Sequence, residues 1–171
     1  MYGRADSFWV PGLLSKAYFE QYIEHKKPVY LGSYTDDCYE QNSKIEQLME
    51  KRGTLRSELG IAKDAFVFLF VGKLIPSRRV DILLSAADKA ERDKRSLEFL
   101  IIGNGEESDK VKSYVESHKN VKWLQSVRRI DLEKYYALAD AYVHPGKEPY
   151  SLSTYEAATA GLPIVASNQV G

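Results

Sequence analysis

The sequence has little that ties it to an oxidising compartment, to nucleic acid or to a membrane. Its 171 residues include one cysteine, Cys38, which excludes an internal disulfide and a cysteine-based zinc site and suits a reducing compartment. The 24 basic and 24 acidic side chains cancel, so no surplus charge favours duplex nucleic acid. No apolar run approaches the roughly 20 residues of a spanning helix, and residues 1–10 lack the charged start and apolar body of a signal peptide. We therefore expect a cytoplasmic protein without a nucleic-acid partner.

Metal-binding and dinucleotide-binding motifs are missing as well. Gly103 and Gly105 follow an apolar run, but a third glycine is absent at the required offset, and Glu106 and Glu107 would repel a phosphate. We predict a turn there. No cluster of His, Asp or Glu has metal-ligand spacing, and no serine–histidine–aspartate order is present. We interpret all histidines as structural, and only a strand-end position favours one of them, His144, as a general base; the others are His25 and His118.

What the sequence does contain is an alternation of short apolar strands with helix-like stretches. Several strand candidates are apolar throughout, as parallel strands covered on both faces are. The strand candidates are Pro28–Leu31, Phe66–Gly72, Leu97–Gly103, Val121–Leu124, Ala141–His144 and Ile164–Ala166. The helix candidates are Val80–Glu91, Ser108–His118, Asp131–Ala139 and Ser153–Ala160. This alternation predicts an α/β fold, a Rossmann-like three-layer sandwich with a mainly parallel, doubly wound sheet.

The first 60 residues give weaker patterns. Within the polar stretch 34–59 we predict a turn at Thr35–Asp37, a helix at Ile45–Lys51 and a break at Gly53. Ser7–Gly12 looks like the last strand of a sheet whose other strands are absent, and Asn168–Gly171 ends in a loop directly after a strand. We therefore expect the sequence to be cut at both ends.

Two carboxylates lie on the last predicted strand–helix–strand crossover. Glu148 follows the strand at Ala141–His144, and Glu156 lies eight positions later in the helix that ends at Gly161. Open α/β sheets bind nucleotides in a crevice of this kind, beyond the carboxyl ends of their strands. The alternative is that both glutamates are solvent-exposed or helix-capping side chains.

A basic loop follows the first strand of the predicted sheet. The strand ends at Gly72, and Lys73 and Arg78 precede a helix that begins near Val80. Glycine lets the backbone come close to a ligand, while lysine offers a diphosphate a mobile point charge and arginine offers a planar fork. Alternatively, Lys73, Arg78 and Arg79 are solvated loop residues of a neutral protein.

Ser151 and Ser153 lie at the start of the helix that ends at Gly161. The backbone N–H groups of this positive helix end point outward, which favours binding of an anion. Ordinary N-capping is the alternative for the two serines, and the two roles are compatible.

Taken in their order along the chain, the strands, the basic loop and the two-glutamate segment resemble the nucleotide-sugar-binding half of the GT-B glycosyltransferases. The specific resemblance is to the retaining family 4, or glycosyl transferases group 1. The resemblance runs from about Phe66 to Gly171, and its most specific part is the Glu-x7-Glu segment that begins at Glu148 and closes in Ala-Gly-Leu-Pro-Ile-Val-Ala-Ser at 160–167. Supporting motifs are Phe-Val-Gly-Lys-Leu-Ile-Pro-Ser-Arg at 70–78, Leu-Ile-Ile-Gly-Asn-Gly at 100–105 and Leu-Glu-Lys-Tyr-Tyr-Ala-Leu-Ala-Asp-Ala-Tyr-Val at 132–143. The resemblance implies that residues 1–60 hold the end of the acceptor half and the interdomain crossover. Residues 61–171 would form the Rossmann-like donor domain, truncated at its C-terminus.

The resemblance also implies roles for single residues. Lys73 and Arg78 stand where the family places an arginine and a lysine against the donor diphosphate, so the two basic types are exchanged here. Glu148 corresponds to a glutamate beside the donor sugar, and Glu156 to one that accepts hydrogen bonds from ribose hydroxyls. Glu148, Lys73 and Arg78 are thus the candidate catalytic residues. Further candidate donor-binding residues are Gly72, Ser151, the backbone amides of Leu152, Ser153 and Thr154, and Val127 near the base.

The sequence departs from the family pattern in two loops. Pro149-Tyr-Ser151 replaces Gly-aromatic-Gly, and because proline has no N–H, the amides that hold the sugar hydroxyls are affected. Arg79 replaces a usual glycine, which the loop can accommodate by turning the arginine side chain outward.

The implied activity is transfer of a sugar, with retention, from a nucleotide-diphospho-sugar to an unknown acceptor in polysaccharide or glycoconjugate biosynthesis. Basic side chains and the helix start would stabilise the leaving diphosphate, so we expect neither a cofactor nor a metal ion. The expected partner is the missing N-terminal acceptor domain, through which alone a membrane would be bound, and the chain by itself is expected to be inactive. One alternative is a non-catalytic nucleotide-sugar-binding subunit that pairs with a separate acceptor-binding chain. Another is an epimerase or phosphorylase that shares the GT-B plan.

Overall fold

The computed structural model describes residues 4–23, 27–32 and 38–170. The chain forms two compact units, Met1–Asp37 and Cys38–Gly171, and each is described here by itself. This division differs from the predicted boundary at 60/61, because residues 38–60 pack with the large sheet-containing unit. The turn predicted at Thr35–Asp37 and His25 lie outside the described residues.

The first unit contains two short parallel strands joined by a helix. Strands β1 (Phe8–Val10) and β2 (Val29–Leu31) pair directly, with Phe8 opposite Val29. Helix α1 (Leu13–Tyr22) connects them, and its Phe19 ring lies 5.2 Å from the Phe8 ring. Both strands were predicted, but their pairing with each other and the helix between them were not.

The second unit is built on a five-stranded parallel sheet with the strand order β5-β4-β3-β6-β7. The strands are β3 (Phe66–Val71), β4 (Leu97–Ile102), β5 (Val121–Leu124), β6 (Ala141–His144) and β7 (Ile164–Ala166). Each agrees with its predicted position to within one residue. The predicted α/β fold with a Rossmann-like, mainly parallel sheet is therefore confirmed.

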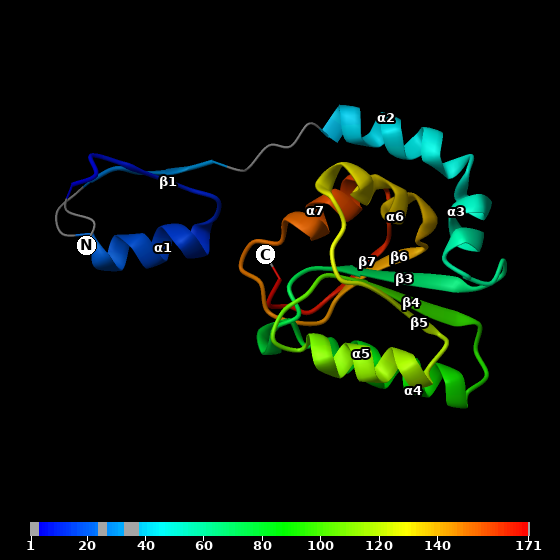
Figure 1. The fold of residues 1–171 in the computed structure, drawn as a ribbon. Helices are drawn as coiled ribbons and strands as arrows, with labels where there is room; N and C mark the ends of the chain where they lie inside the picture. The colour runs from blue at the N-terminus through cyan, green and yellow to red at the C-terminus, as the bar shows by residue number, and fades with distance from the viewer. Residues whose placement is uncertain (1–3, 24–26, 33–37, 171) are drawn as a thin grey trace. The chain divides into compact units, whose positions relative to one another are not determined.

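Helices cover both faces of this sheet (Figure 1). One face carries α4 (Val80–Arg92) and α5 (Ser108–Ser117), and the other carries α6 (Leu132–Leu138) and α7 (Leu152–Thr159). Short 3-10 turns, η1 (Pro76–Arg78) and η2 (Arg129–Asp131), precede α4 and α6. The four helices were predicted, with ends that differ by at most one residue.

The central strand shows why its sequence is apolar throughout. Successive side chains of a strand point to opposite faces. Val67 and Leu69 accordingly enter the core under α6, whereas Phe68 and Phe70 enter the core under α4. Both faces are covered, so neither set of side chains can be polar without loss of packing.

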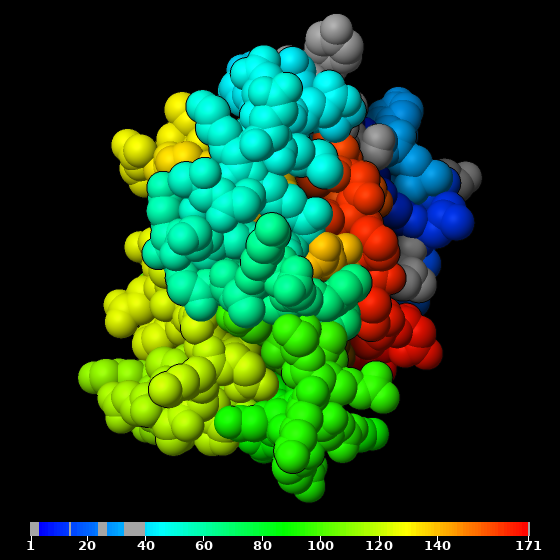
Figure 2. Space-filling view, turned by 90° about the vertical axis from the view of Figure 1, so that its right-hand side faces the viewer, coloured from blue at the N-terminus to red at the C-terminus, as the bar shows by residue number. Residues whose placement is uncertain are grey.

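Two further helices pack outside α6. Helix α2 (Cys38–Met49) places Ile45 in the core, and α3 (Arg52–Glu58) follows after a short break. In the space-filling view their side chains, in cyan, cover the upper part of the face shown (Figure 2). The helix predicted at Ile45–Lys51 therefore begins earlier, and the break predicted at Gly53 is wrong because Gly53 lies inside α3. Glycine is tolerated there because it is near the helix start, where few intrahelical bonds depend on it.

The order of the strands places two loops side by side. From β3 the chain moves outward to β4 and β5, and then returns to the other side of β3 to form β6. The loops after β3 and β6 therefore leave neighbouring strands at the point where the winding direction reverses, which is where such sheets bind ligands. Among the helices of the described residues, none has the length and apolar character needed to cross a membrane.

Candidate donor-binding site

The loops after β3 and β6 are in direct backbone contact. A Cβ on Gly146 would lie 2.3 Å from Arg78 Cα, so only glycine allows this approach. The Lys147 amide also donates to the Ser77 carbonyl at 2.7 Å. The two loops thus form one continuous wall beside the carboxyl ends of β3 and β6.

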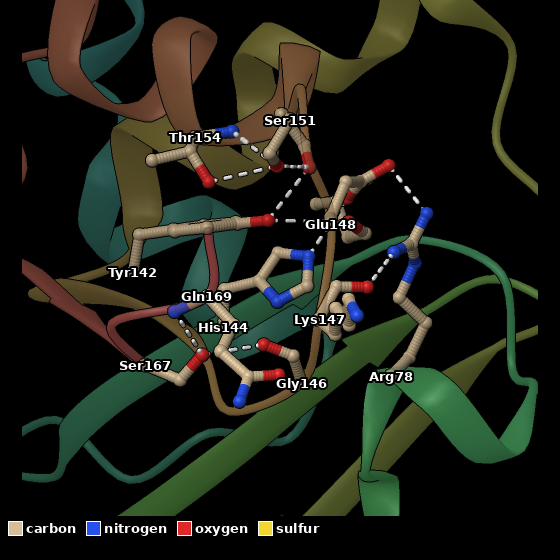
Figure 3. Close-up of polar contacts among 12 residues, drawn as sticks. Arg78, Tyr142, His144, Gly146, Lys147, Glu148, Ser151, Thr154, Ser167 and Gln169 are labelled. Carbon is tan, nitrogen blue, oxygen red and sulfur yellow. Dashed lines mark hydrogen bonds and ion pairs between the residues drawn. The ribbon is translucent and has the colours of Figure 1, made fainter. Parts of the chain in front are cut away.

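Arg78, Glu148 and His144 form a chain of polar contacts along this wall (Figure 3). Arg78 Nη2 lies 2.5 Å from Glu148 Oε1, and Arg78 Nη1 donates to the Lys147 carbonyl. His144 Nε2 lies 2.8 Å from Glu148 Oε2. Two predicted site residues, Arg78 and Glu148, are therefore brought together, and the glutamate has a second partner in the histidine.

Lys73 lies on the exposed side of the loop after β3. The next residue, Leu74, is buried, and its amide donates to the Asn104 carbonyl at 2.8 Å, which holds this loop against the one after β4. Gly72 takes part in the same packing, because a Cβ on Gly103 would lie 1.8 Å from the Gly72 carbonyl oxygen. Within the described part of the chain, no carboxylate pairs with the Lys73 ammonium, so its charge is available to a ligand.

Arg79 has the backbone conformation expected of a residue that replaces glycine. Its φ and ψ of 54° and 45° are left-handed, and the residue joins η1 to α4. Its exposed guanidinium pairs with Asp81, with Nη2 2.9 Å from Oδ2. Hydrogen bonding to this guanidinium lowers the pKa of the Asp81 carboxyl. The side chain is therefore turned outward, as expected.

Helix α7 begins at the same wall with a side-chain cap. Ser151 is fully buried, and its hydroxyl accepts hydrogen bonds from the Thr154 amide at 3.3 Å and the Thr154 hydroxyl at 2.8 Å. The predicted capping role is confirmed for Ser151. The amides of Leu152 and Ser153 belong to the first turn, where the helix itself supplies no carbonyl partner.

Ser153 contacts a buried tyrosine instead of capping the helix. Its hydroxyl lies 2.7 Å from the Tyr142 hydroxyl, which also donates to the Val71 carbonyl at 3.2 Å. Burial raises the pKa of Tyr142 to about 12, so this tyrosine is neutral. The Tyr142 hydroxyl thereby ties the start of α7 to the carboxyl end of β3.

Glu156 lies further along α7 and faces a different set of partners. It is 8% exposed, and its Oε2 accepts from the Tyr136 hydroxyl at 2.8 Å. Its Oε1 lies 3.1 Å from Nη1 of the exposed Arg129. Burial and the negative charge of Glu156 raise the pKa of Tyr136. Val127, in the loop before η2, is partly buried against the core cluster that includes Tyr136.

The comparisons with known proteins agree with this architecture. Residues 51–171 match the family described as "Glycosyl transferases group 1". The chain belongs to this family. Among curated relatives, the "Alpha-monoglucosyldiacylglycerol synthase" of Acholeplasma laidlawii is 27% identical over 143 residues, which is 81% of this chain and 33% of that protein. The chain spans about a third of the length of the first curated relatives that it matches.

Solved structures of glycosyltransferases share the fold. WaaG, a glycosyltransferase involved in lipopolysaccharide biosynthesis, superposes with a TM-score of 0.78 at 22% identity, covering 99% of this chain and 46% of that one. The pneumococcal O-GlcNAc transferase GtfA, solved with UDP and GlcNAc, gives 0.69 at 18% identity over 96% of this chain and 30% of that one. At these identities the similarity establishes the fold, which is that of a GT-B Rossmann-like domain.

Several polar residues of this group 1 domain were not found from the sequence. His144 was interpreted as structural, Tyr136 and Tyr142 were noted only as parts of the motif at 132–143, and Arg129 was not considered. Their contacts join different elements, such as Tyr136 in α6 with Glu156 in α7, and no local spacing reports them. One signal was available, because His144 and Glu148 are four residues apart in a loop that contains Pro145 and Gly146.

Proposed function

We propose that this chain is the donor-binding part of a glycosyltransferase that uses a nucleotide-diphospho-sugar. The observation that carries the proposal is the convergence of positive groups at the reversal point of the sheet. Lys73 and Arg78 come from the loop after β3, and the start of α7 comes from the loop after β6. A diphosphate is the ligand that such a combination of cations and helix amides favours.

The chemistry follows from where charge develops during transfer. As the bond from the anomeric carbon to the diphosphate breaks, negative charge grows on the leaving group, and fixed positive groups stabilise it. A guanidinium carries five N–H groups. Arg78 uses one on Glu148 and one on the Lys147 carbonyl, so it retains others for phosphate oxygens. With these groups in place, the reaction requires no metal ion or cofactor.

The two glutamates would orient the donor and would not act as an acid–nucleophile pair. Glu148 is placed to accept hydrogen bonds from the sugar, and Glu156 from the ribose, in agreement with the family resemblance. Retention of anomeric configuration is part of the same proposal. The name of the Acholeplasma laidlawii relative supports transfer of a sugar, and the UDP in the GtfA structure supports a nucleotide donor. The acceptor would be bound by parts of the protein that correspond to the remaining two thirds of the relatives.

The donor site is tested by calorimetric titration of UDP-glucose, GDP-mannose and ADP-glucose into the purified chain. We expect one of them to bind selectively. Replacing Lys73 or Glu156 with alanine removes a contact to a charged group, so binding should weaken by about tenfold or more. Lys63→Ala is the matched control, because Lys63 is also an exposed lysine but precedes β3, whereas Lys73 follows it.

The control separates a specific contact from a general effect of charge. Equal losses of affinity in Lys63→Ala and Lys73→Ala would mean that Lys73 does not contact the diphosphate. If the folded chain bound none of the three sugar nucleotides, the donor-binding proposal would be wrong for this chain.

A further inference from the structure

His144 is a buried polar residue that the proposed mechanism does not use. It is the last residue of β6 and is 0% exposed. Its ring lies edge-on to Phe70, with the ring centroids 5.8 Å apart, and its Nε2 lies 2.8 Å from Glu148 Oε2. Burial of a polar group in an apolar setting costs free energy unless the group is hydrogen-bonded, so the contact with Glu148 accounts for how this ring is accommodated.

The contact with Glu148 defines which nitrogen carries the proton. A carboxylate can only accept, so Nε2 must donate, and Nδ1 is the unprotonated nitrogen of a neutral ring. His144 Nδ1 is itself buried, and none of the described residues forms a hydrogen bond with it. A proton on Nδ1 would therefore be a buried donor without an acceptor, which disfavours the other neutral tautomer.

Each oxygen of the Glu148 carboxylate then has one protein donor. Oε1 receives Arg78 Nη2, and Oε2 receives His144 Nε2 (Figure 3). A carboxylate accepts about four hydrogen bonds, so each oxygen retains acceptor capacity. Because the two donors lie on different oxygens, they determine both the position of the carboxylate and the direction of its remaining lone pairs.

The backbone around this carboxylate is held as well. The Glu148 amide donates to the Gln169 carbonyl at 3.1 Å, and the Ser167 amide donates to the His144 carbonyl at 3.0 Å. The Ser167 hydroxyl donates to the Gly146 carbonyl at 2.6 Å. The loop between His144 and Glu148 is thus attached to the segment after β7. The freedom that remains is rotation of the Glu148 side chain, which His144 restricts together with Arg78.

We propose that His144 is a positioning residue that orients the Glu148 carboxylate toward the hydroxyl groups of the donor sugar. This inference rests on the proposed function, because it concerns the same donor. His144 touches neither substrate nor reacting atoms, and it acts through Glu148. A histidine that only filled space in the core would affect stability but not the contribution of the sugar to donor affinity.

Two replacements distinguish these roles. The amide nitrogen of glutamine can reach the position of Nε2, whereas that of the shorter asparagine reaches only the position of Nδ1. We expect His144→Asn to weaken binding of the selected sugar nucleotide about tenfold and to leave binding of the corresponding nucleoside diphosphate unchanged. His144→Gln should restore the affinity for the sugar nucleotide. Calorimetry with UDP-glucose and UDP, or the GDP or ADP pair if that donor is selected, measures both affinities.

The outcomes separate this inference from the function on which it rests. If the unsubstituted chain binds none of the sugar nucleotides, the proposed function and the positioning role are both wrong. If it binds one, and both variants bind that donor equally well or equally poorly, only the positioning role is wrong.

A measurement without ligand covers the case in which a variant does not fold. Long-range ¹H–¹⁵N correlation spectra of the unsubstituted chain report which nitrogen of His144 is protonated. We expect the Nε2–H tautomer. The Nδ1–H tautomer would overturn the positioning role, whether or not the donor binds, because His144 could then not donate to Glu148.

Discussion

Replacing Gly103 with alanine is expected to destabilise the sheet-containing unit by about 3 kcal/mol. Gly103 follows β4 and has a φ of +143°, a conformation that residues with a side chain rarely adopt. The new Cβ would lie 1.8 Å from the Gly72 carbonyl oxygen. The backbone there cannot easily shift, because the Gly72 amide donates to Ile102 and the Gly103 amide donates to Leu124, at 3.0 and 2.9 Å. Urea unfolding measures the loss as a lower midpoint concentration.

Two other glycines serve as matched controls for this prediction. Gly161, after α7, also has a positive φ of 73°, but a Cβ there meets nothing within 4 Å, so Gly161→Ala should cost only about 1 kcal/mol. Gly53 lies inside α3 with equally open space, and Gly53→Ala should be neutral or stabilise by up to about 1 kcal/mol. A loss in Gly103→Ala no larger than that in Gly161→Ala would mean that the loops after β3 and β4 are not in contact in solution.

The sheet could be predicted from the sequence because each of its strands is a short run that is mostly apolar. Phe66–Val71 and Leu97–Ile102 have apolar side chains on both faces, which is characteristic of strands buried between two layers of helices. The turn at Gly103 and Gly105 was also predicted. The close packing of Gly103 against the backbone of Gly72 joins residues 31 positions apart in the sequence and has no local signal.

The helices that were missed or misjudged lack strong local signals. Helix α1 (Leu13–Tyr22) has no acidic residue in its first turn, no basic residue in its last turn and no side-chain cap. Gly53 was taken as a helix break, although the break lies between Met49 and Arg52. For α2 and α3, tertiary packing determines where the helices form, because Ile45 on α2 and Arg56 on α3 are buried within the sheet-containing unit.

The residues of the candidate site could be predicted from the sequence, but the contacts between them could not. The types and order of Lys73, Arg78, Glu148 and Ser151 follow a pattern that the sequence displays. The contact of Arg78 with Glu148, 70 residues apart, arises only when β3 and β6 become neighbours. The role proposed for His144 requires in addition that its Nε2 faces the carboxylate. Sequence thus indicates which residues are candidates for the site, and the fold determines which of them are in contact.

Replacing Asp140 with alanine is expected to destabilise the same unit by about 3 kcal/mol. The Asp140 carboxylate lies between α6 and β6 and receives Arg52 Nη2 at 2.5 Å, Arg56 Nη2 at 2.6 Å and the Val67 amide at 2.8 Å. Arg56 is 8% exposed and also donates to the Leu138 and Ala65 carbonyls. Without the carboxylate, the buried Arg56 guanidinium has no counter-charge, the Val67 amide loses this acceptor, and α3 loses the charged partner that its two arginines share.

The pH dependence of stability provides an independent check of this attachment. Burial alone raises the pKa of Asp140, but hydrogen bonds from Val67, Arg56 and Arg52 outweigh it and leave the pKa lowered. A carboxylate whose pKa is lower in the native state than in the unfolded state stabilises the folded protein. This contribution is fully present at pH values above the unfolded-state pKa of about 3.9. It is lost as the pH falls through the lower native-state pKa. The difference in unfolding free energy between the unsubstituted chain and Asp140→Ala should therefore be largest near pH 7 and shrink in acid.

Asp81→Ala, which breaks the exposed pair with Arg79, should change stability little, because solvent screens that pair. An equal loss in both variants would mean that Asp140 does not link α3 to the sheet, whereas a loss confined to Asp140→Ala would place residues 38–60 within the sheet-containing unit in solution.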